Sequence, residues 1–261
     1  GQFNLAKKVP GKEEFYETIR YFGKQIQITG VNLQLNTLAT PDTLKGFDEV
    51  ILATGVTPRD AKLPNNGGHA VRYYDVLAHN APVGKRVAVV GAGGIGFDIS
   101  EFVTHDPAHP AASVDIATYN TQWGVIDPEH AQGGLAKPAP AAAVREVTLL
   151  QRKDEPLGKN LGKTTGWAHR ANLKMMKVKF VQGASYDQIS DKGLHITVGG
   201  KAEIIPADTV ILCTGQEPRR ELYAPLQAMG LSVHLIGGAD VAAELDAKRA
   251  INQGAELAAR L

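Results

Sequence analysis

The sequence predicts an α/β fold, on two observations. One segment occurs twice, as DEVILATGVTPR over 48–59 and as DTVILCTGQEPR over 208–219. Each copy is typical of a buried strand that ends at a Thr-Gly turn, followed by a proline that cannot extend a sheet. A further buried strand, 85–90, leads directly into the glycine-rich sequence GAGGIG of 91–96 and then into a helical stretch, 97–104. Strand, glycine turn and helix in this order are typical of a Rossmann-like, three-layer unit with a parallel sheet.

The glycine-rich sequence has the pattern G-x-G-x-x-G. Gly91 permits a tight turn, Gly93 lets the backbone approach a pyrophosphate, and Gly96 lets the helix pack closely on the strand. Gly94 and Ile95 complete a helix start whose N–H groups face an anion. The pattern alone is a weak signal, but its strand and helix supply the required context. We therefore predict a dinucleotide site here rather than a purely structural turn.

The next expected strand, 146–151, ends in Gln151 followed by Arg152 and Lys153. An NAD site usually has an acidic residue here for the ribose hydroxyls, whereas a 2′-phosphate requires Arg or Lys. The two cations favour NADPH over a merely solvated basic strand end. We also expect Lys163 or Arg170 to help hold the cofactor phosphates, although both could be plain surface charges.

The first copy of the repeat has no glycine motif before it. Residues 1–36 contain a helical stretch, 13–27, and a short expected strand, 32–35, but nothing that resembles GAGGIG. If both copies descend from one dinucleotide-binding unit, the first unit has lost its beginning. We therefore expect that the polypeptide has been cut upstream of Gly1.

Two other segments complete the expected fold. Residues 232–236 form a last strand, and 241–261 form a last helix for which Asp240 is the predicted N-cap. The Pro- and Ala-rich stretch 105–143 is expected to be an insertion loop, because connections in α/β units usually have about 2–6 residues.

Composition and charge exclude several classes of partner. The net charge is only +1, which disfavours nucleic acid and anionic lipid, and the chain lacks an apolar run of the roughly 20 residues that span a bilayer. Its one cysteine, Cys213, excludes an internal disulfide and an iron–sulfur site built by this chain alone. A reducing cytoplasm fits this composition.

Three weaker motifs are assigned structural roles. The segment 158–164 resembles a phosphate-binding P-loop, but its glycines are spaced one residue too closely. His105 and His109, with Asp106 between them, have the spacing of metal ligands but lie among prolines, so we predict no metal site. Cys213 matches Ala53 of the first copy and is expected to be a small core residue.

With these residues placed, the chain resembles the C-terminal half of bacterial NADPH-dependent 2,4-dienoyl-CoA reductases, within the flavoproteins that have two nested dinucleotide-binding domains. The resemblance runs nearly end to end. Its blocks are GQFN of 1–4, PGK of 10–12, the fingerprint 91–98, WG of 123–124, QRK of 151–153, LGKTTGW of 161–167, and HLIGG of 234–238 through RA of 249–250.

The resemblance implies two sets of cofactor contacts. Gly93, Gly94, Arg152 and Lys153 would hold NADPH, and Gly215 would end a strand that lines the same site. The contacts implied for FAD are Gln2, Lys12, Ala39, Gly55, Asp240 and Val241. Gly55 and Gly215 could equally be plain turn formers, and Asp240 a simple helix cap.

The resemblance also implies an NADP-binding domain over 61–219, inserted between the pieces 1–60 and 220–261 of an incomplete FAD-binding domain. In such enzymes NADPH gives hydride to FAD, and electrons pass through an iron–sulfur cluster to FMN, which reduces the dienoyl-CoA of fatty acid oxidation. The FMN barrel and the cluster segment would be missing partners from the same polypeptide. No catalytic side chain is therefore expected here, because the cofactors carry the chemistry.

Other functions remain open from the sequence alone. The chain could be a non-catalytic NADP-binding module, a complete small flavin reductase, or the electron-input half of a related flavoprotein that acts on other enones or on amines. Because the first glycine motif is lacking, we expect FAD to be absent or weakly bound, and NADPH to bind better.

Overall fold

The computed structural model describes residues 1–243 and 247–261, which divide into two compact units. The smaller unit comprises residues 1–2, 21–59 and 215–261, and the larger comprises 3–20 and 60–214. The expected division placed the whole of 1–60 with the C-terminal piece. The structure instead assigns 3–20 to the larger unit, because Leu5 and Val9 are buried in its hydrophobic core.

A parallel sheet of five strands forms the centre of the larger unit, in the order β4-β11-β5-β6-β7. Its strands are β4 (Ala70–Arg72), β5 (Arg86–Val90), β6 (Glu146–Leu150), β7 (Lys179–Val181) and β11 (Thr209–Leu212). The strands expected near 85–90, 146–151 and 208–213 are therefore present. In β5, Ala88, Val89 and Val90 are fully buried, which accounts for the continuous apolar run in the sequence.

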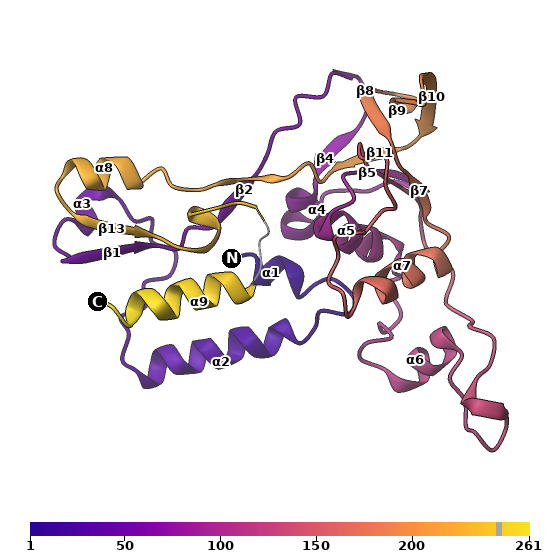
Figure 1. Cartoon of the computed structure of the whole chain (residues 1–261), viewed down its shortest axis with the longest axis horizontal. Coiled ribbons are helices and arrows are strands. Elements are labelled where there is room, and N and C mark those ends of the chain that lie inside the picture. The colour runs from indigo at the N-terminus through magenta and orange to yellow at the C-terminus, as the bar shows by residue number, and fades with distance from the viewer. Residues whose placement is uncertain (244–246) are drawn as a thin grey trace. The chain divides into compact units, whose positions relative to one another are not determined.

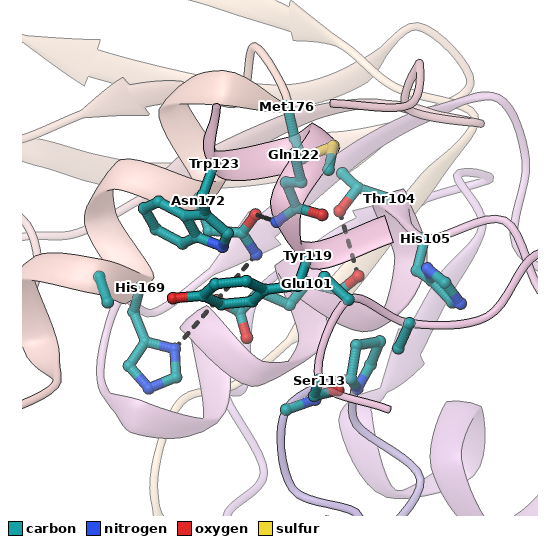
Figure 2. A pocket seen from close by; sticks show the side chains of 15 residues that line it. Glu101, Thr104, His105, Ser113, Tyr119, Gln122, Trp123, His169, Asn172 and Met176 are labelled. Carbon is teal, nitrogen blue, oxygen red and sulfur yellow. Dashed lines mark hydrogen bonds and ion pairs between the residues drawn. The ribbon is translucent and has the colours of Figure 1, made fainter. Parts of the chain in front are cut away.

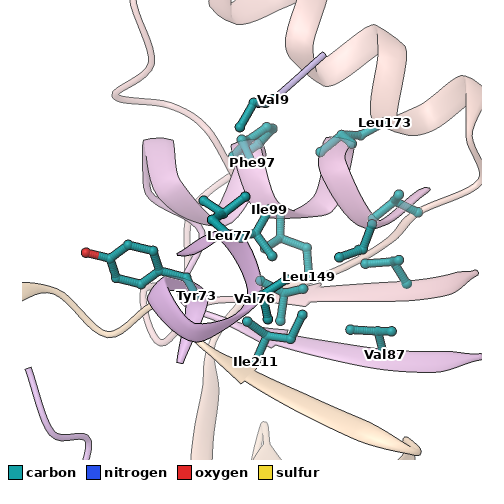
Figure 3. Close-up of a cluster of buried hydrophobic side chains, with 14 of the residues drawn as sticks. Val9, Tyr73, Val76, Leu77, Val87, Phe97, Ile99, Leu149, Leu173 and Ile211 are labelled. Carbon is teal, nitrogen blue, oxygen red and sulfur yellow. The ribbon is translucent and has the colours of Figure 1, made fainter. Parts of the chain in front are cut away.

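Helices cover one face of this sheet (Figure 1). They are α1 (Phe3–Ala6), α4 (Tyr73–His79), α5 (Gly94–Thr104) and α7 (Gly166–Met175). Phe97 and Ile99 of α5 pack with Leu149 of the sheet and Leu173 of α7 in the cluster drawn in Figure 3. The helix α5 begins at Gly94, inside the glycine motif, three residues before the expected start.

A second sheet, of mixed strand direction, covers the other face of the parallel sheet. Its order is β10-β9-β8-β3, from β3 (Asn65–Asn66), β8 (Ala184–Ser190), β9 (Gly193–Val198) and β10 (Lys201–Pro206). Ile189, Leu194 and Ile196 of this sheet share a buried cluster with Ala88 and Val90 of β5. The larger unit therefore has three layers, which confirms the predicted α/β, Rossmann-like class.

The smaller unit is built on two parallel strands, β1 (Glu49–Leu52) and β13 (Ser232–Leu235). It also contains α3 (Pro41–Leu44), α8 (Tyr223–Ala228), the 3-10 turn η2 (Gly237–Ala239) and α9 (Ala247–Ala258). Val50 and Leu52 of β1 are buried with Leu226 of α8. The helix α2 (Phe15–Ile28) crosses from the larger unit into the smaller one.

The two copies of the sequence repeat pair with each other. Their tails form β2 (Val56–Pro58) and β12 (Gln216–Pro218), which are antiparallel. The amide N–H of Arg59 donates to the carbonyl of Gly215 at 3.0 Å, and that of Arg219 donates to the carbonyl of Gly55 at 2.9 Å. Each copy thus makes the same hydrogen bond to the other.

Two expectations about the connecting segments were wrong. The strand expected over 32–35 is irregular and exposed, because its side chains pack into none of the three buried clusters of the described residues. The expected loop 105–143 contains a helix, α6 (Ile116–Trp123), and the short turn η1 (Gln132–Gly134). Asp115 caps α6 through its carboxylate, and Gly124 ends it in a left-handed conformation.

The expected start of the last helix was also wrong. Val241 and Ala242 are not helical, and α9 is described from Ala247, while residues 244–246 of the expected helix lie outside the described residues. Asp240 ends the η2 turn instead of capping a helix at Val241. Its carboxylate accepts a hydrogen bond of 2.9 Å from Gln253 Nε2 of α9.

An ion pair joins α5 to α7. Glu101 of α5 is buried, and its Oε1 accepts from His169 Nδ1 of α7 at 2.9 Å. This hydrogen bond raises the pKa of His169, against the opposing effect of burial. The exposed pair of His109 and Asp106 has the same 2.9 Å separation.

The buried ion pair of Glu101 and His169 should stabilise the fold, whereas the exposed pair of Asp106 and His109 should not. We expect His169→Ala to lower the free energy of unfolding by about 3 kcal/mol, because it leaves a buried carboxylate without its partner. The control His109→Ala should cost less than about 1 kcal/mol. Because folding raises the pKa of His169, the charged pair contributes its full share of the free energy of unfolding below about pH 6.5. This contribution decreases as pH rises through the raised pKa. Urea unfolding across this range measures both differences, and equal losses in the two variants would contradict this role.

The two glycines near the start of α5 should differ in their tolerance of a methyl group. A Cβ on Gly96 would lie 1.8 Å from the carbonyl oxygen of Gly91, whereas a Cβ on Gly94 would meet no described atom within 4 Å. We expect Gly96→Ala to cost at least about 1–3 kcal/mol, because the backbone must shift. Gly94→Ala should leave the melting temperature nearly unchanged. A wild-type melting temperature for Gly96→Ala would exclude the close approach.

Candidate functional site

The glycine turn lies at the carboxyl end of β5, between two neighbouring strands. Gly91 has a φ of +107°, and a Cβ there would lie 2.3 Å from the carbonyl oxygen of Cys213, so only glycine fits. The amide of Gly91 donates to the carbonyl of Leu150 at 2.9 Å. Ligands of parallel α/β sheets bind at this edge.

The N-terminus of α5 is open toward this edge. Gly93 is its N-cap residue, and a Cβ on Gly93 or Gly94 would meet no atom within 4 Å in the described part of the chain. The first amides of a helix carry a partial positive charge and accept anions. The turn therefore leaves free the space that a phosphate group requires.

A pocket of about 280 Å³ opens at these glycines. It is lined by Ala92, Gly93, Gly94, Gln151, Arg152, Lys153, Glu155, Gly158, Lys159, Asn160 and Leu161. The side-chain amide of Gln151 donates to the carbonyl of Lys153 at 3.1 Å and also to the carbonyl of Glu155. This amide holds the turn that follows β6.

The charged side chains of the pocket are mostly positive. Glu155 Oε2 pairs with Lys159 Nζ at 3.0 Å, and Glu155 Oε1 with Lys153 Nζ at 3.6 Å. The hydrogen bond from Lys159 is the main cause of the lowered pKa of Glu155, so this carboxylate is ionised at neutral pH. With Arg152 there are three cations to one anion. The pocket is suited to an anionic ligand.

The structure brings together several of the residues expected to bind NADPH and separates others. Gly93, Gly94, Arg152 and Lys153 line one pocket, whereas Lys163 is exposed outside it. Arg170 Nη1 donates to the carbonyl of Gly158 at 2.8 Å, so this side chain anchors the loop rather than lining the pocket.

Sequence reasoning missed Glu155, Lys159 and Asn160, which line the pocket. Lys159 and Asn160 belong to the segment that resembles a P-loop, and Glu155 lies just before it. The glycine of that segment, Gly158, is the signal in the sequence that could have indicated them. Gly158 has a φ of +73°, and a Cβ there would lie 2.7 Å from Phe97 Cζ of α5. The loop therefore packs directly on the helix of the glycine motif.

Some residues expected to bind FAD lie together in the smaller unit. A Cβ on Gly238 of the η2 turn would lie 2.7 Å from Val56 Cγ1 and 3.2 Å from the carbonyl carbon of Gly55. The chain continues from this turn into Asp240 and Val241, so Gly55 lies close to this segment.

The other residues expected at the cofactors lie elsewhere. Gln2 and Ala39 are exposed, and Gly215 belongs to the smaller unit with a φ of +100°. Lys12 lies in the larger unit, where its Nζ pairs with Asp98 Oδ2 of α5 at 2.6 Å. Lys12 thus ties the N-terminal segment to the helix of the glycine motif.

The remaining motifs have structural surroundings. Cys213 follows β11 and packs against the core of the larger unit, and burial raises the pKa of its thiol well above the usual range. In residues 1–243 and 247–261, no group of three or more His, Cys, Asp or Glu side chains could hold a metal ion. Across the same residues, no helix is both long and apolar enough to cross a membrane.

The three-layer fold and the glycine turn define a pyridine-nucleotide oxidoreductase domain of the flavoprotein type. The model of the family described as pyridine nucleotide-disulphide oxidoreductase matches residues 12–249. The chain belongs to this family.

Curated relatives of the chain are reductases. It is 27% identical to a metal reductase of Desulforamulus reducens, over 92% of this chain and 36% of the relative. It is 24% identical to a cinnamate reductase of Clostridium sporogenes, over 89% of this chain and 30% of the relative. It is 22% identical to a bilirubin reductase of Mediterraneibacter gnavus, over 97% of this chain and 34% of the relative.

Solved structures share the fold. A 2-naphthoyl-CoA reductase in complex with 2-naphthoyl-CoA has a TM-score of 0.78 at 23% identity, and covers 100% of this chain and 34% of its own. Histamine dehydrogenase of Rhizobium sp. 4-9 has a TM-score of 0.71 at 18% identity, and the match covers 100% of this chain and 38% of the dehydrogenase chain. The chain thus spans about a third of the length of these relatives.

Proposed function

We propose that this chain is the electron-input part of a flavin-dependent reductase, which binds NADPH and passes its hydride to FAD. The observation that supports this most is the cationic pocket at the open N-terminus of α5. Its turn has the close glycine contacts of a dinucleotide site, at Gly91 and Gly96.

In this proposal, the backbone amides after Gly93 bind the pyrophosphate of the nicotinamide cofactor. Arg152 and Lys153 bind the 2′-phosphate, Arg152 through the bidentate geometry of its guanidinium group. Lys159 adds a third positive charge and holds Glu155, which would otherwise repel the phosphate. The site therefore prefers NADPH to NADH.

We further propose that the smaller unit contributes one side of an FAD site. The first group of its contacts is Gly55, Asp240 and Val241, and the second is Gln2 and Ala39. Lys12 belongs to the larger unit and is an FAD contact on the sequence resemblance alone. The packing of Gly238 on Gly55 supports the first group. The parallel sheet of the smaller unit has only two strands, β1 and β13. The described residues of this unit also contain no turn like that of Gly91. We therefore expect FAD to bind weakly.

For the whole protein we propose reduction of a 2,4-dienoyl-CoA, by electrons that leave FAD for an iron–sulfur cluster and FMN outside this chain. Three observations support a larger partner region: the sequence resemblance, the lengths of the relatives, and a structural neighbour named as a 2-naphthoyl-CoA reductase. The chain itself would bind and orient the two nucleotides, because the chemistry belongs to the cofactors.

The two cations after β6 should decide which nicotinamide cofactor binds. We expect Arg152→Ala and Lys153→Ala each to weaken NADPH binding about 10- to 100-fold, because each removes a charge-assisted contact to the 2′-phosphate. NADH affinity should change less than about threefold. Calorimetric titration of both cofactors measures this, with Lys192→Ala, an exposed cation of the β8–β9 turn, as the control. Equal losses for the two cofactors would refute the 2′-phosphate assignment.

The isolated chain should retain NADPH and lose FAD. We expect the purified protein to show little flavin absorbance, because the described residues of the smaller unit contain no glycine turn like that of Gly91, yet to bind NADPH in a fluorescence titration. Added FAD should then accept hydride, observed as loss of NADPH absorbance. Stoichiometric FAD in the purified chain would overturn the first expectation. Binding of NADPH without hydride transfer would favour a non-catalytic module.

A further inference from the structure

A second pocket lies inside the larger unit, away from the glycine turn. Its volume is about 200 Å³, and it shares no lining residue with the pocket at Gly93 among the residues that the structure describes. Glu101 of α5 lies in its wall, seven residues after Gly94, or about 10 Å along the helix. The pocket is therefore separate from the proposed NADPH site.

The insertion after α5 builds one side of this pocket. Tyr119, Gln122 and Trp123 all project from α6, and Ser113 lies in the segment before it. Figure 2 shows these side chains facing those of α5 and α7. The additional length of the connection between α5 and β6 thus encloses a cavity that a short loop would leave open.

The base of the pocket is a buried carboxylate. The Glu101 side chain is 4% exposed, and both of its hydrogen bonds, from His169 at 2.9 Å and from Asn172 at 3.4 Å, end on Oε1. Within the described residues, the other carboxylate oxygen, Oε2, has no hydrogen-bond partner. It is also not one of the unpartnered side-chain atoms that are completely buried. This oxygen is therefore free to accept a hydrogen bond from a molecule in the pocket.

The wall of the pocket is aromatic. The rings of Tyr119 and Trp123 have centroids 6.3 Å apart and planes inclined by 35°, and Trp167 meets Trp123 edge to face at 6.3 Å. Tyr119 is 47% exposed, which leaves the pocket accessible from solvent. Aromatic faces attract cations, and a carboxylate makes its strongest hydrogen bonds with charged donors.

We propose that this pocket binds a small primary ammonium ion with an apolar body, whose nitrogen donates to Glu101 Oε2 while its body packs on Tyr119 and Trp123. The carboxylate supplies the opposite charge, and the aromatic rings exclude water from the contact. The cavity is large enough for a molecule such as benzylammonium. Binding of this ion does not require a cofactor at the glycine turn.

The hydrogen bond to Glu101 raises the pKa of His169, so below that raised value a proton on the imidazole balances the carboxylate of Glu101. The charged and titratable groups around this imidazole are Glu101 and Asp98 of α5, Lys12, and His105 and Tyr119 at the pocket wall. A bound ammonium ion replaces the imidazolium as the counter-ion of Glu101. Binding should therefore strengthen as pH rises through the raised pKa of His169, and below that value it should release a proton.

The test is calorimetric titration of the whole chain with benzylammonium chloride, and with benzyl alcohol as the uncharged probe. We expect benzylammonium to bind at least tenfold more tightly than benzyl alcohol. Glu101→Gln, which keeps the shape of the side chain, should lower the benzylammonium affinity at least tenfold. The control Glu203→Gln removes an exposed carboxylate of β10 and should leave it unchanged.

Two further variants test the aromatic wall if Glu101→Gln does not fold. Tyr119→Leu and Trp123→Leu should each lower the benzylammonium affinity at least threefold, while NADPH binding and the melting temperature report on folding. Equal binding of benzylammonium and benzyl alcohol would overturn the proposal and define a merely apolar cavity. Lack of benzylammonium binding to the wild-type chain, or unchanged binding to Glu101→Gln, would also overturn it.

Discussion

The close approach of backbone segments at Gly91 is the constraint on which the larger unit depends. The turn lies against the carbonyl of Cys213 on one side, and Gly96 of α5 lies against the carbonyl of Gly91 on the other. Neither contact leaves room for a side chain. Because α5 is fixed at this distance from the sheet, its N-terminus, Phe97 beneath Gly158, and Glu101 further along all take defined positions.

The same helix therefore positions both pockets. Its first turn opens toward Arg152, Lys153 and Lys159, where the available charge is positive. Its last turn places the carboxylate of Glu101 among aromatic and amide side chains. The two ends of one element thus present opposite electrostatic environments. The two proposed ligands would therefore not compete, because the two pockets share no lining residue among the described residues.

The sequence was sufficient for features that depend on local backbone requirements. The glycine pattern, the apolar run of β5 and the two copies of the repeat each reflect a constraint on consecutive residues. The helix α6 was missed because the prolines around it favour an irregular segment, and only its Asp115 cap and Gly124 end signal a helix. Lys159 was missed because it reaches the pocket through the packing of Gly158 on Phe97, a contact between residues far apart in the sequence. The start of α9 was misplaced because Asp240 has a partner, Gln253, that no local pattern reveals.

The reciprocal pairing of β2 and β12 has a mechanical consequence. Both strands belong to the smaller unit, and Arg59 and Arg219, the residues that follow them, each donate a backbone hydrogen bond to the other copy. Sliding of one strand along the other would leave these two donors, and the carbonyls of Gly55 and Gly215, without their protein partners. The repeat therefore fixes the register of this strand pair from both ends.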